Sequence, residues 1–80
     1  PVTVLVVEDE GLLCDIIVEE LEEVGFTVVR AASAGEALGI IESGRTIDVL
    51  FTDIRLPGGL DGWDLAERFR ARNPQGPVIY

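Results

Sequence analysis

The chain has 80 residues, with fifteen acidic residues against six basic ones and a formal net charge of -9 at pH 7. This length allows one domain at most, and the negative charge argues against non-specific attraction to nucleic acid or to an anionic membrane surface. All six basic residues are arginines and there is no histidine, which excludes a Walker A lysine, a Schiff-base lysine and a catalytic histidine.

The first quarter of the chain predicts a strand followed by a helix. Residues 2–7 are apolar without alternation, which is typical of a strand buried on both faces in a parallel sheet. The acids of residues 8–10 end this strand. A helix is expected over residues 12–24, with Gly25 as its C-terminal stop. Its apolar positions at helical spacing predict one apolar, inward face, with the acids of this helix facing elsewhere: Leu13, Ile16, Ile17, Leu21 and Val24.

A second strand, a second helix and a third strand follow. Residues 26–31 predict the strand, and Ser33 with Glu36 three residues later is a capping-box pattern that opens the helix. Gly44 ends this helix. The third strand is predicted over residues 47–51.

The last part of the chain predicts a third helix and the start of a fourth strand. A Gly/Pro loop spans residues 57–59, Asp61 is the expected N-cap, and the helix ends near residues 73–74. Residues 77–80 begin the fourth strand. The alternation predicts right-handed βαβ units in one α/β domain over residues 1–80. Three residues of the third helix are expected to point inward: Leu65, Ala66 and Phe69.

Acidic side chains follow the first and third predicted strands. Glu8 and Asp9 come after the first strand and Asp53 comes after the third. Ligands of open α/β sheets bind beyond the carboxyl ends of the strands. If these strands are neighbours, about 4.8 Å apart, the three carboxylates can share one small ion. Two such charges about 4 Å apart repel by roughly 4 kcal/mol at an effective dielectric near 20, so protons or a divalent cation must offset them. Oxygen ligands favour Mg²⁺.

A carboxylate held against magnesium can act as a nucleophile toward phosphorus, and Asp53 is the candidate. Acids after a strand are also common as helix caps or turn residues, and for one acid alone that structural interpretation is favoured. Acids at two neighbouring strand ends favour the metal site instead.

Several segments together resemble the receiver domains of two-component signalling in bacteria. The resemblance implies a flavodoxin-like, three-layer α/β fold with a parallel sheet in the strand order 2-1-3-4-5. It covers nearly the whole chain. The segments are Val4-Leu5-Val6-Val7-Glu8-Asp9-Glu10, Val49-Leu50-Phe51-Thr52-Asp53, Leu56-Pro57 and Asp61-Gly62.

The resemblance also implies roles for particular residues. Asp53 would accept a phosphoryl group from a phosphohistidine, with Mg²⁺ as cofactor. Asp9 and Asp53 would bind the metal, Glu8 would act on it through water, and the main-chain carbonyl of Arg55 would be a further ligand. The donor would be a sensor histidine kinase or a histidine phosphotransfer protein in the cytoplasm. The domain would be a phosphorelay switch and not an enzyme, catalysing only its own phosphorylation and slow dephosphorylation.

The chain departs from the family pattern in two places. The Asp-Gly pair lies one residue further from the acceptor than usual, which makes residues 58–60 resemble a one-residue insertion. The family's switch hydroxyl follows strand four and its lysine follows strand five, whereas this chain stops at Tyr80 and has no lysine. We therefore expect the N-terminal two-thirds of a receiver, without strand five, the last helices or an output domain. The bare edge of strand four predicts marginal stability or self-association.

Three other functions are compatible with parts of this pattern. A pseudo-receiver would keep the fold as a protein-interaction module without phosphorylation, and the three acids argue against it. A phosphatase with an aspartyl nucleophile needs a second aspartate two residues after the first, where this chain has Arg55. A nucleotide or flavin domain needs a Gly-rich loop after strand one, where residues 8–10 would repel phosphate.

Overall fold

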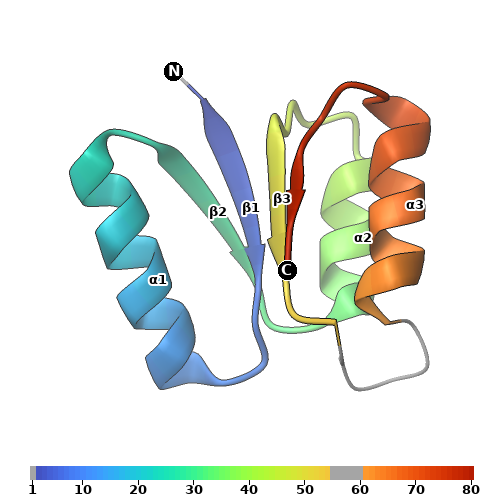
Figure 1. The fold of residues 1–80 in the computed structure, drawn as a ribbon. Helices are drawn as coiled ribbons and strands as arrows, with labels where there is room; N and C mark the ends of the chain where they lie inside the picture. Colours follow the sequence, from blue (N-terminus) through green and yellow to red (C-terminus); the bar gives the residue numbers. More distant parts are fainter. Residues whose placement is uncertain (1, 55–60) are drawn as a thin grey trace.

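The computed structural model describes residues 2–54 and 61–80. Strands and helices alternate along these residues, as Figure 1 shows. In chain order the elements are β1 Thr3–Val7, α1 Gly11–Val24, β2 Thr27–Ala31, α2 Ala34–Glu42, β3 Val49–Thr52, α3 Gly62–Arg72 and β4 Val78–Ile79.

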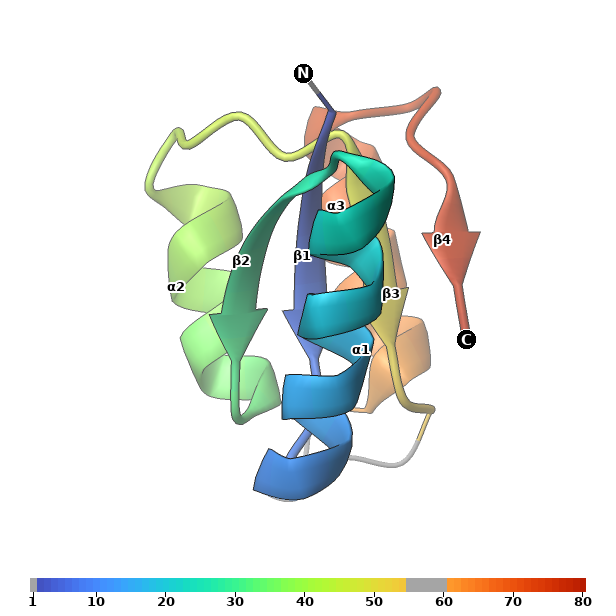
Figure 2. The same ribbon diagram turned by 90° about the vertical axis from the view of Figure 1, so that its left-hand side faces the viewer.

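The four strands form one parallel sheet in the order β2-β1-β3-β4. Helix α1 covers one face of this sheet, and α2 and α3 cover the other (Figures 1 and 2). The three-layer, flavodoxin-like α/β fold is therefore confirmed, with the first four strands in the predicted order. This order makes β1 and β3 neighbours.

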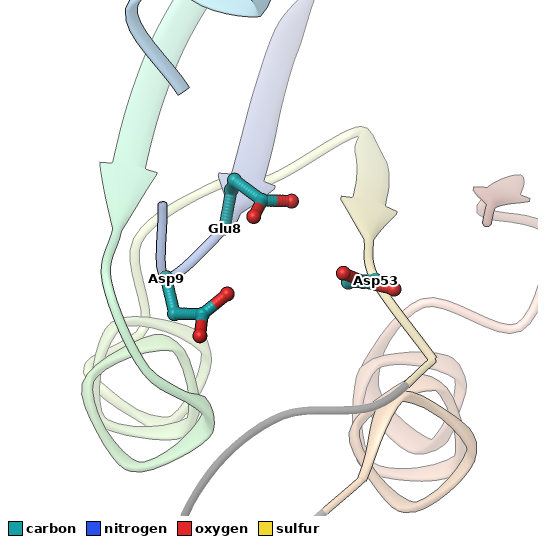
Figure 3. A group of neighbouring side chains, drawn as sticks. All are labelled: Glu8, Asp9 and Asp53. Carbon is teal, nitrogen blue, oxygen red and sulfur yellow. The ribbon is translucent and has the colours of Figure 1, made fainter. Parts of the chain in front are cut away.

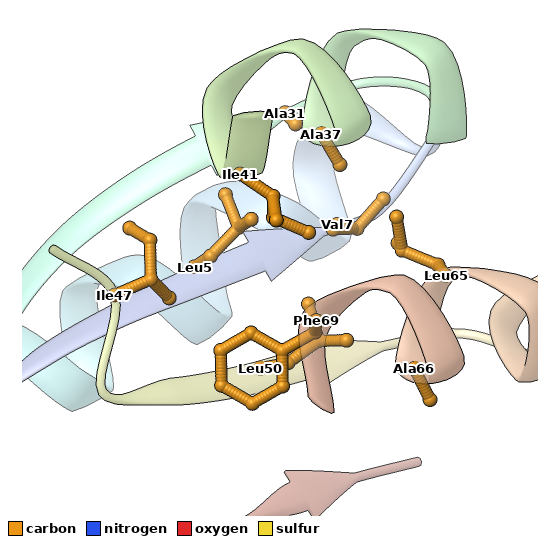
Figure 4. Close-up of a cluster of buried hydrophobic side chains, with 10 residues drawn as sticks. All are labelled: Leu5, Val7, Ala31, Ala37, Ile41, Ile47, Leu50, Leu65, Ala66 and Phe69. Carbon is orange, nitrogen blue, oxygen red and sulfur yellow. The ribbon is translucent and has the colours of Figure 1, made fainter. Parts of the chain in front are cut away.

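Strand β1 sends its side chains alternately into two cores. Val4 and Val6 pack with Cys14 on the face covered by α1. Leu5 and Val7 point to the opposite face, toward α2 and α3 (Figure 4). All four strand residues are at most 3% exposed, which explains the unbroken apolar run in the sequence. The larger core consists of Leu5, Val7, Ala31, Ala37, Ile41, Ile47, Leu50, Leu65, Ala66 and Phe69.

Three of the predicted helix ends, at Gly25, Ser33 and Asp61, are confirmed. Gly25 ends α1 in the left-handed region, with φ of 105°, which favours glycine. The Ser33 hydroxyl accepts a hydrogen bond of 3.1 Å from the Glu36 N–H at the start of α2. The Asp61 carboxylate accepts one of 2.9 Å from the Asp64 N–H, and the Asp64 carboxylate accepts one of 3.4 Å from the Asp61 N–H. This second bond completes a capping box at α3.

The predicted inward face of α1 is wrong in part. The side chains that pack against the sheet are Cys14, Ile17, Val18 and Leu21. Leu13, Ile16 and Val24 were expected among them, but they are 41%, 59% and 74% exposed. At about 100° per residue, these three positions lie on the helix surface beside Ile17, on the side away from Cys14 and Val18. They are therefore apolar but lie outside the part of α1 that packs against the described sheet.

The predicted bounds of β3 and β4 also needed correction. Ile47 was expected to begin the third strand but precedes it, although it is only 5% exposed. Its carbonyl accepts a hydrogen bond of 2.6 Å from the side chain of Asn73. The fourth strand was expected from Pro77 to Tyr80 and is confined to Val78–Ile79. An apolar sequence pattern predicts which residues are buried, but it does not predict which main-chain groups form the hydrogen bonds between strands.

Strand β4 pairs with β3 and lies at one edge of the described sheet. Self-association through this edge stays a prediction. Among the described residues, none of the helices is both long and apolar enough to span a membrane.

Candidate functional site

The sheet brings the three predicted acids to one place. Val7 of β1 is in register with Thr52 of β3, so the residues that follow them leave the sheet side by side. One carboxylate oxygen from each of Glu8, Asp9 and Asp53 lies within 4.8 Å of the other two. Figure 3 shows the side chains of Glu8 and Asp9, just after β1, pointing in the direction of Asp53. The predicted convergence of these side chains is thus observed.

Main-chain hydrogen bonds hold the ends of both strands. The Glu8 N–H donates to the Ala31 carbonyl at 3.1 Å, and the Asp53 N–H donates to the Val7 carbonyl at 3.4 Å. The Glu8 carboxylate accepts a further bond of 3.2 Å from the Glu10 N–H. The main chains of Glu8 and Asp53 are therefore attached to neighbouring strands of a packed sheet, which limits how far these two residues can move apart.

The three carboxylates differ in their exposure. Glu8 is buried, with 8% of its surface exposed, whereas Asp9 and Asp53 are exposed. Burial raises the pKa of Glu8 above its ordinary value, and the nearby charges of Asp53 and Asp9 raise it further, against the lowering effect of the Glu10 N–H. The ionised cluster is therefore under electrostatic repulsion.

We predict that Glu8→Gln stabilises the metal-free fold at neutral pH. Because the folded-state pKa of Glu8 is raised, its protonated form is favoured in the fold, and stability is lost as pH rises above the ordinary value of 4.5. Glutamine stays neutral and can still accept the Glu10 N–H. Urea unfolding with a chelator, at neutral pH and below 4.5, measures the difference between wild type and variant, which should shrink at low pH.

The matched control is Glu19→Gln, which neutralises an exposed acid on α1. It should change the free energy of unfolding less than Glu8→Gln does. A Glu8→Gln protein that is less stable than wild type at neutral pH, in the absence of metal, would show that the carboxylate is not under repulsion.

The donor set fits a magnesium ion. All three groups offer carboxylate oxygen, the hard ligand that Mg²⁺ prefers. Two oxygens bound about 2.1 Å from one ion can be at most about 4.2 Å apart. The observed limit of 4.8 Å is close to this value, so a small side-chain rotation or one bridging water would complete the site. The predicted ligand carbonyl of Arg55, and the insertion at residues 58–60, lie outside the described residues.

A small cavity of about 130 Å³ opens beside the acids. Its lining includes Glu8 and Asp9 together with Arg30 of β2. The Arg30 guanidinium is paired with the Asp15 carboxylate at 2.6 Å, which raises the pKa of Arg30. No local sequence pattern predicted that Arg30 lies beside the acids. The available signal was its position near the carboxyl end of β2, beside β1.

A second cavity, of about 290 Å³, lies at the opposite end of the domain between α2 and α3. Arg45 and Arg72 line it, and none of the three clustered acids does. Arg72 is the last residue of α3, where positive charge offsets the helix dipole, and Arg45 follows the end of α2 by three residues. This cavity is therefore separate from the acidic site.

The parallel α/β sheet, and the three acids at the ends of two adjacent strands, match the arrangement that the resemblance to receiver domains implies. The family model described as the response regulator receiver domain matches residues 4–80. The chain therefore belongs to the response regulator receiver family of two-component systems. The predicted family is confirmed.

Individual relatives agree with this assignment. The probable transcriptional regulatory protein TcrX of Mycobacterium tuberculosis is 34% identical over 79 residues, which are 99% of this chain and 33% of that protein. A receiver protein from Sinorhizobium medicae has a similar structure, with a TM-score of 0.96 and 35% identity over 99% of this chain and 64% of that one. The response regulator TrrA of Thermotoga maritima, solved in complex with Mg²⁺ and BeF, has a TM-score of 0.86 and 31% identity over 98% of this chain and 66% of its own. The chain thus spans a third of the TcrX length and about two-thirds of the two solved chains.

Proposed function

We propose that Asp53 accepts a phosphoryl group from a phosphohistidine, with Mg²⁺ bound by Asp9 and Asp53 and, through water, by Glu8. The observation that carries this proposal is the group of three carboxylates at the ends of β1 and β3, within 4.8 Å of one another. Family membership supports it, and so does the magnesium complex of the similar regulator TrrA.

Each acid has a distinct part in the proposed reaction. An Asp53 oxygen attacks the phosphorus, forming an acyl phosphate as the bond from phosphorus to the donor imidazole breaks. Asp53 is exposed, as a group that receives phosphate from another protein must be, whereas Glu8 is buried. A bound Mg²⁺ would neutralise charge on the phosphoryl oxygens. The negative charges of the Glu8 and Asp9 carboxylates would attract and retain such an ion.

The proposed partner is a sensor histidine kinase or a histidine phosphotransfer protein in the cytoplasm. The net charge of -9 supports a protein partner over nucleic acid or an anionic membrane. The proposed activity is limited to the domain's own phosphorylation and slow hydrolysis of the acyl phosphate. The competing function is a pseudo-receiver that binds partners without phosphorylation.

Magnesium dependence separates these two functions. We predict that the intact protein, incubated with acetyl phosphate and Mg²⁺, gains the mass of one phosphoryl group, and that a chelator suppresses this gain. The reason is that phosphate would otherwise approach three carboxylates without a cation. Intact-mass spectrometry measures both states. Absence of labelling in both, with a folded protein, would favour the pseudo-receiver.

A further inference from the structure

We propose that Gly62 is a positioning residue for the acceptor: its lack of a side chain lets the first turn of α3 rest directly on the main chain of Asp53 and Ile54. This inference rests on the proposed phosphoacceptor function, because the orientation of the Asp53 carboxylate is what Gly62 would control.

Space, and not backbone conformation, requires glycine at this position. Gly62 is buried, and its φ is not positive, unlike that of Gly25 and Gly44. A Cβ added to Gly62 would lie 2.8 Å from the Ile54 Cα and 3.1 Å from the Asp53 carbonyl carbon, with the Asp53 carbonyl oxygen closer still. Real Cβ atoms essentially never come within 3.0 Å of another heavy atom. These are main-chain atoms, which cannot rotate away as a flexible side chain can.

A hydrogen bond joins the same two segments. The Gly62 N–H donates to the Ile54 carbonyl at 2.7 Å. The capping box of Asp61 and Asp64 fixes the helix start beside it. The end of β3 and the beginning of α3 are therefore held together by one hydrogen bond and by a close contact that only glycine allows.

The acceptor segment should give way before the helix does. Helix α3 is anchored in the core by Leu65 and Phe69, which are 0% and 2% exposed. Asp53 and Ile54 are exposed, and the Asp53 N–H has a long ladder bond of 3.4 Å. Moving the Ile54 Cα from 2.8 Å to an ordinary contact of 3.4 Å requires a shift of at least about 0.6 Å, and the Asp53 carbonyl oxygen, which is closer still, requires more. Misplacement of a reacting group by about 1 Å can lower a rate by about 100-fold.

The test compares Gly62→Ala with Gly35→Ala in the intact protein. Gly35 lies on α2 with open space at its Cβ position, so alanine there adds a methyl group without a clash. We expect Gly62→Ala to lower the rate of labelling by acetyl phosphate by roughly 10- to 100-fold per folded molecule. It should also weaken Mg²⁺ binding and shift the amide resonances of Asp53 and Ile54. Gly35→Ala should leave all three readouts unchanged.

If Gly62→Ala lowers the folded fraction, the same substitution is examined together with Gly35→Ala and Gly39→Ala. Both fill open positions on α2, where alanine favours the helix. Unchanged labelling, unchanged Mg²⁺ binding and unmoved resonances in folded Gly62→Ala would overturn the proposal. If wild type itself is not labelled, the phosphoacceptor function fails, and the resonances of Asp53 and Ile54 alone decide whether Gly62 positions them.

Discussion

Asp53→Asn should abolish labelling of the intact protein by acetyl phosphate and magnesium. Asparagine keeps the size of the side chain but removes the anionic oxygen that would attack phosphorus. Neither Glu8 nor Asp9 should accept the phosphoryl group instead, because Glu8 is buried and Asp9 follows β1, whereas Asp53 follows β3. Intact-mass spectrometry measures the labelled fraction, and circular dichroism confirms that the variant is folded.

Asp15→Asn is the matched control for this substitution. Asp15 is an exposed aspartate on α1, and its pair with Arg30 has side chains that are 59% and 51% exposed. Loss of such an exposed pair changes stability by at most about 1 kcal/mol. The control protein should therefore be labelled like wild type. Equal labelling of Asp53→Asn and wild type would show that the phosphoryl group is carried elsewhere.

The second large effect is expected from Leu50→Ala, on stability. Leu50 is 0% exposed in β3, in register with Leu5 of β1 and with Val78 of β4. Truncation of a buried leucine costs about 2–5 kcal/mol through lost burial and the cavity left behind. This is a large share of the roughly 5–15 kcal/mol of a typical domain. Urea unfolding, followed by circular dichroism, measures the change in the free energy of unfolding.

Leu12→Ala provides the comparison. Leu12 lies on α1 and is 76% exposed, so its truncation should change the free energy of unfolding by about 0.5 kcal/mol or less. Similar costs for the two leucine variants would contradict the assignment of Leu50 to the core and of Leu12 to the surface. The placement of β3 between β1 and β4 would then need revision, because it is this placement that puts Leu50 in the core.

The sequence was sufficient to predict the elements and the place of the acids. The unbroken apolar run of β1 indicates burial on both faces, and Val4 and Leu5 do enter opposite cores. The strand order implied by the family resemblance makes strands one and three neighbours, and the rule that ligands bind beyond the carboxyl ends of parallel strands then predicts that Asp9 and Asp53 meet. Their separation in sequence does not matter, because the strand order alone brings their main chains together.

Other features depend on tertiary contacts that no local pattern contains. Glu8 and Asp9 are adjacent acids, yet the first is buried and the second is exposed. Leu13 and Cys14 are adjacent on α1, and only Cys14 packs against the sheet. The contact of Gly62 with the main chain of Asp53 is set by how α3 docks on the sheet. These distinctions require the packed structure.

The most direct test of the central claim locates the phosphoryl group after labelling with magnesium. Borohydride reduces an acyl phosphate to the alcohol, so a phosphorylated aspartate becomes homoserine, which peptide mass spectrometry can place in the sequence. We predict homoserine at position 53 in the labelled protein, and aspartate there when magnesium is chelated. A reduced side chain at Asp9 or at another residue, or none at all in a folded and magnesium-loaded protein, would contradict the assignment of Asp53 as the phosphoacceptor.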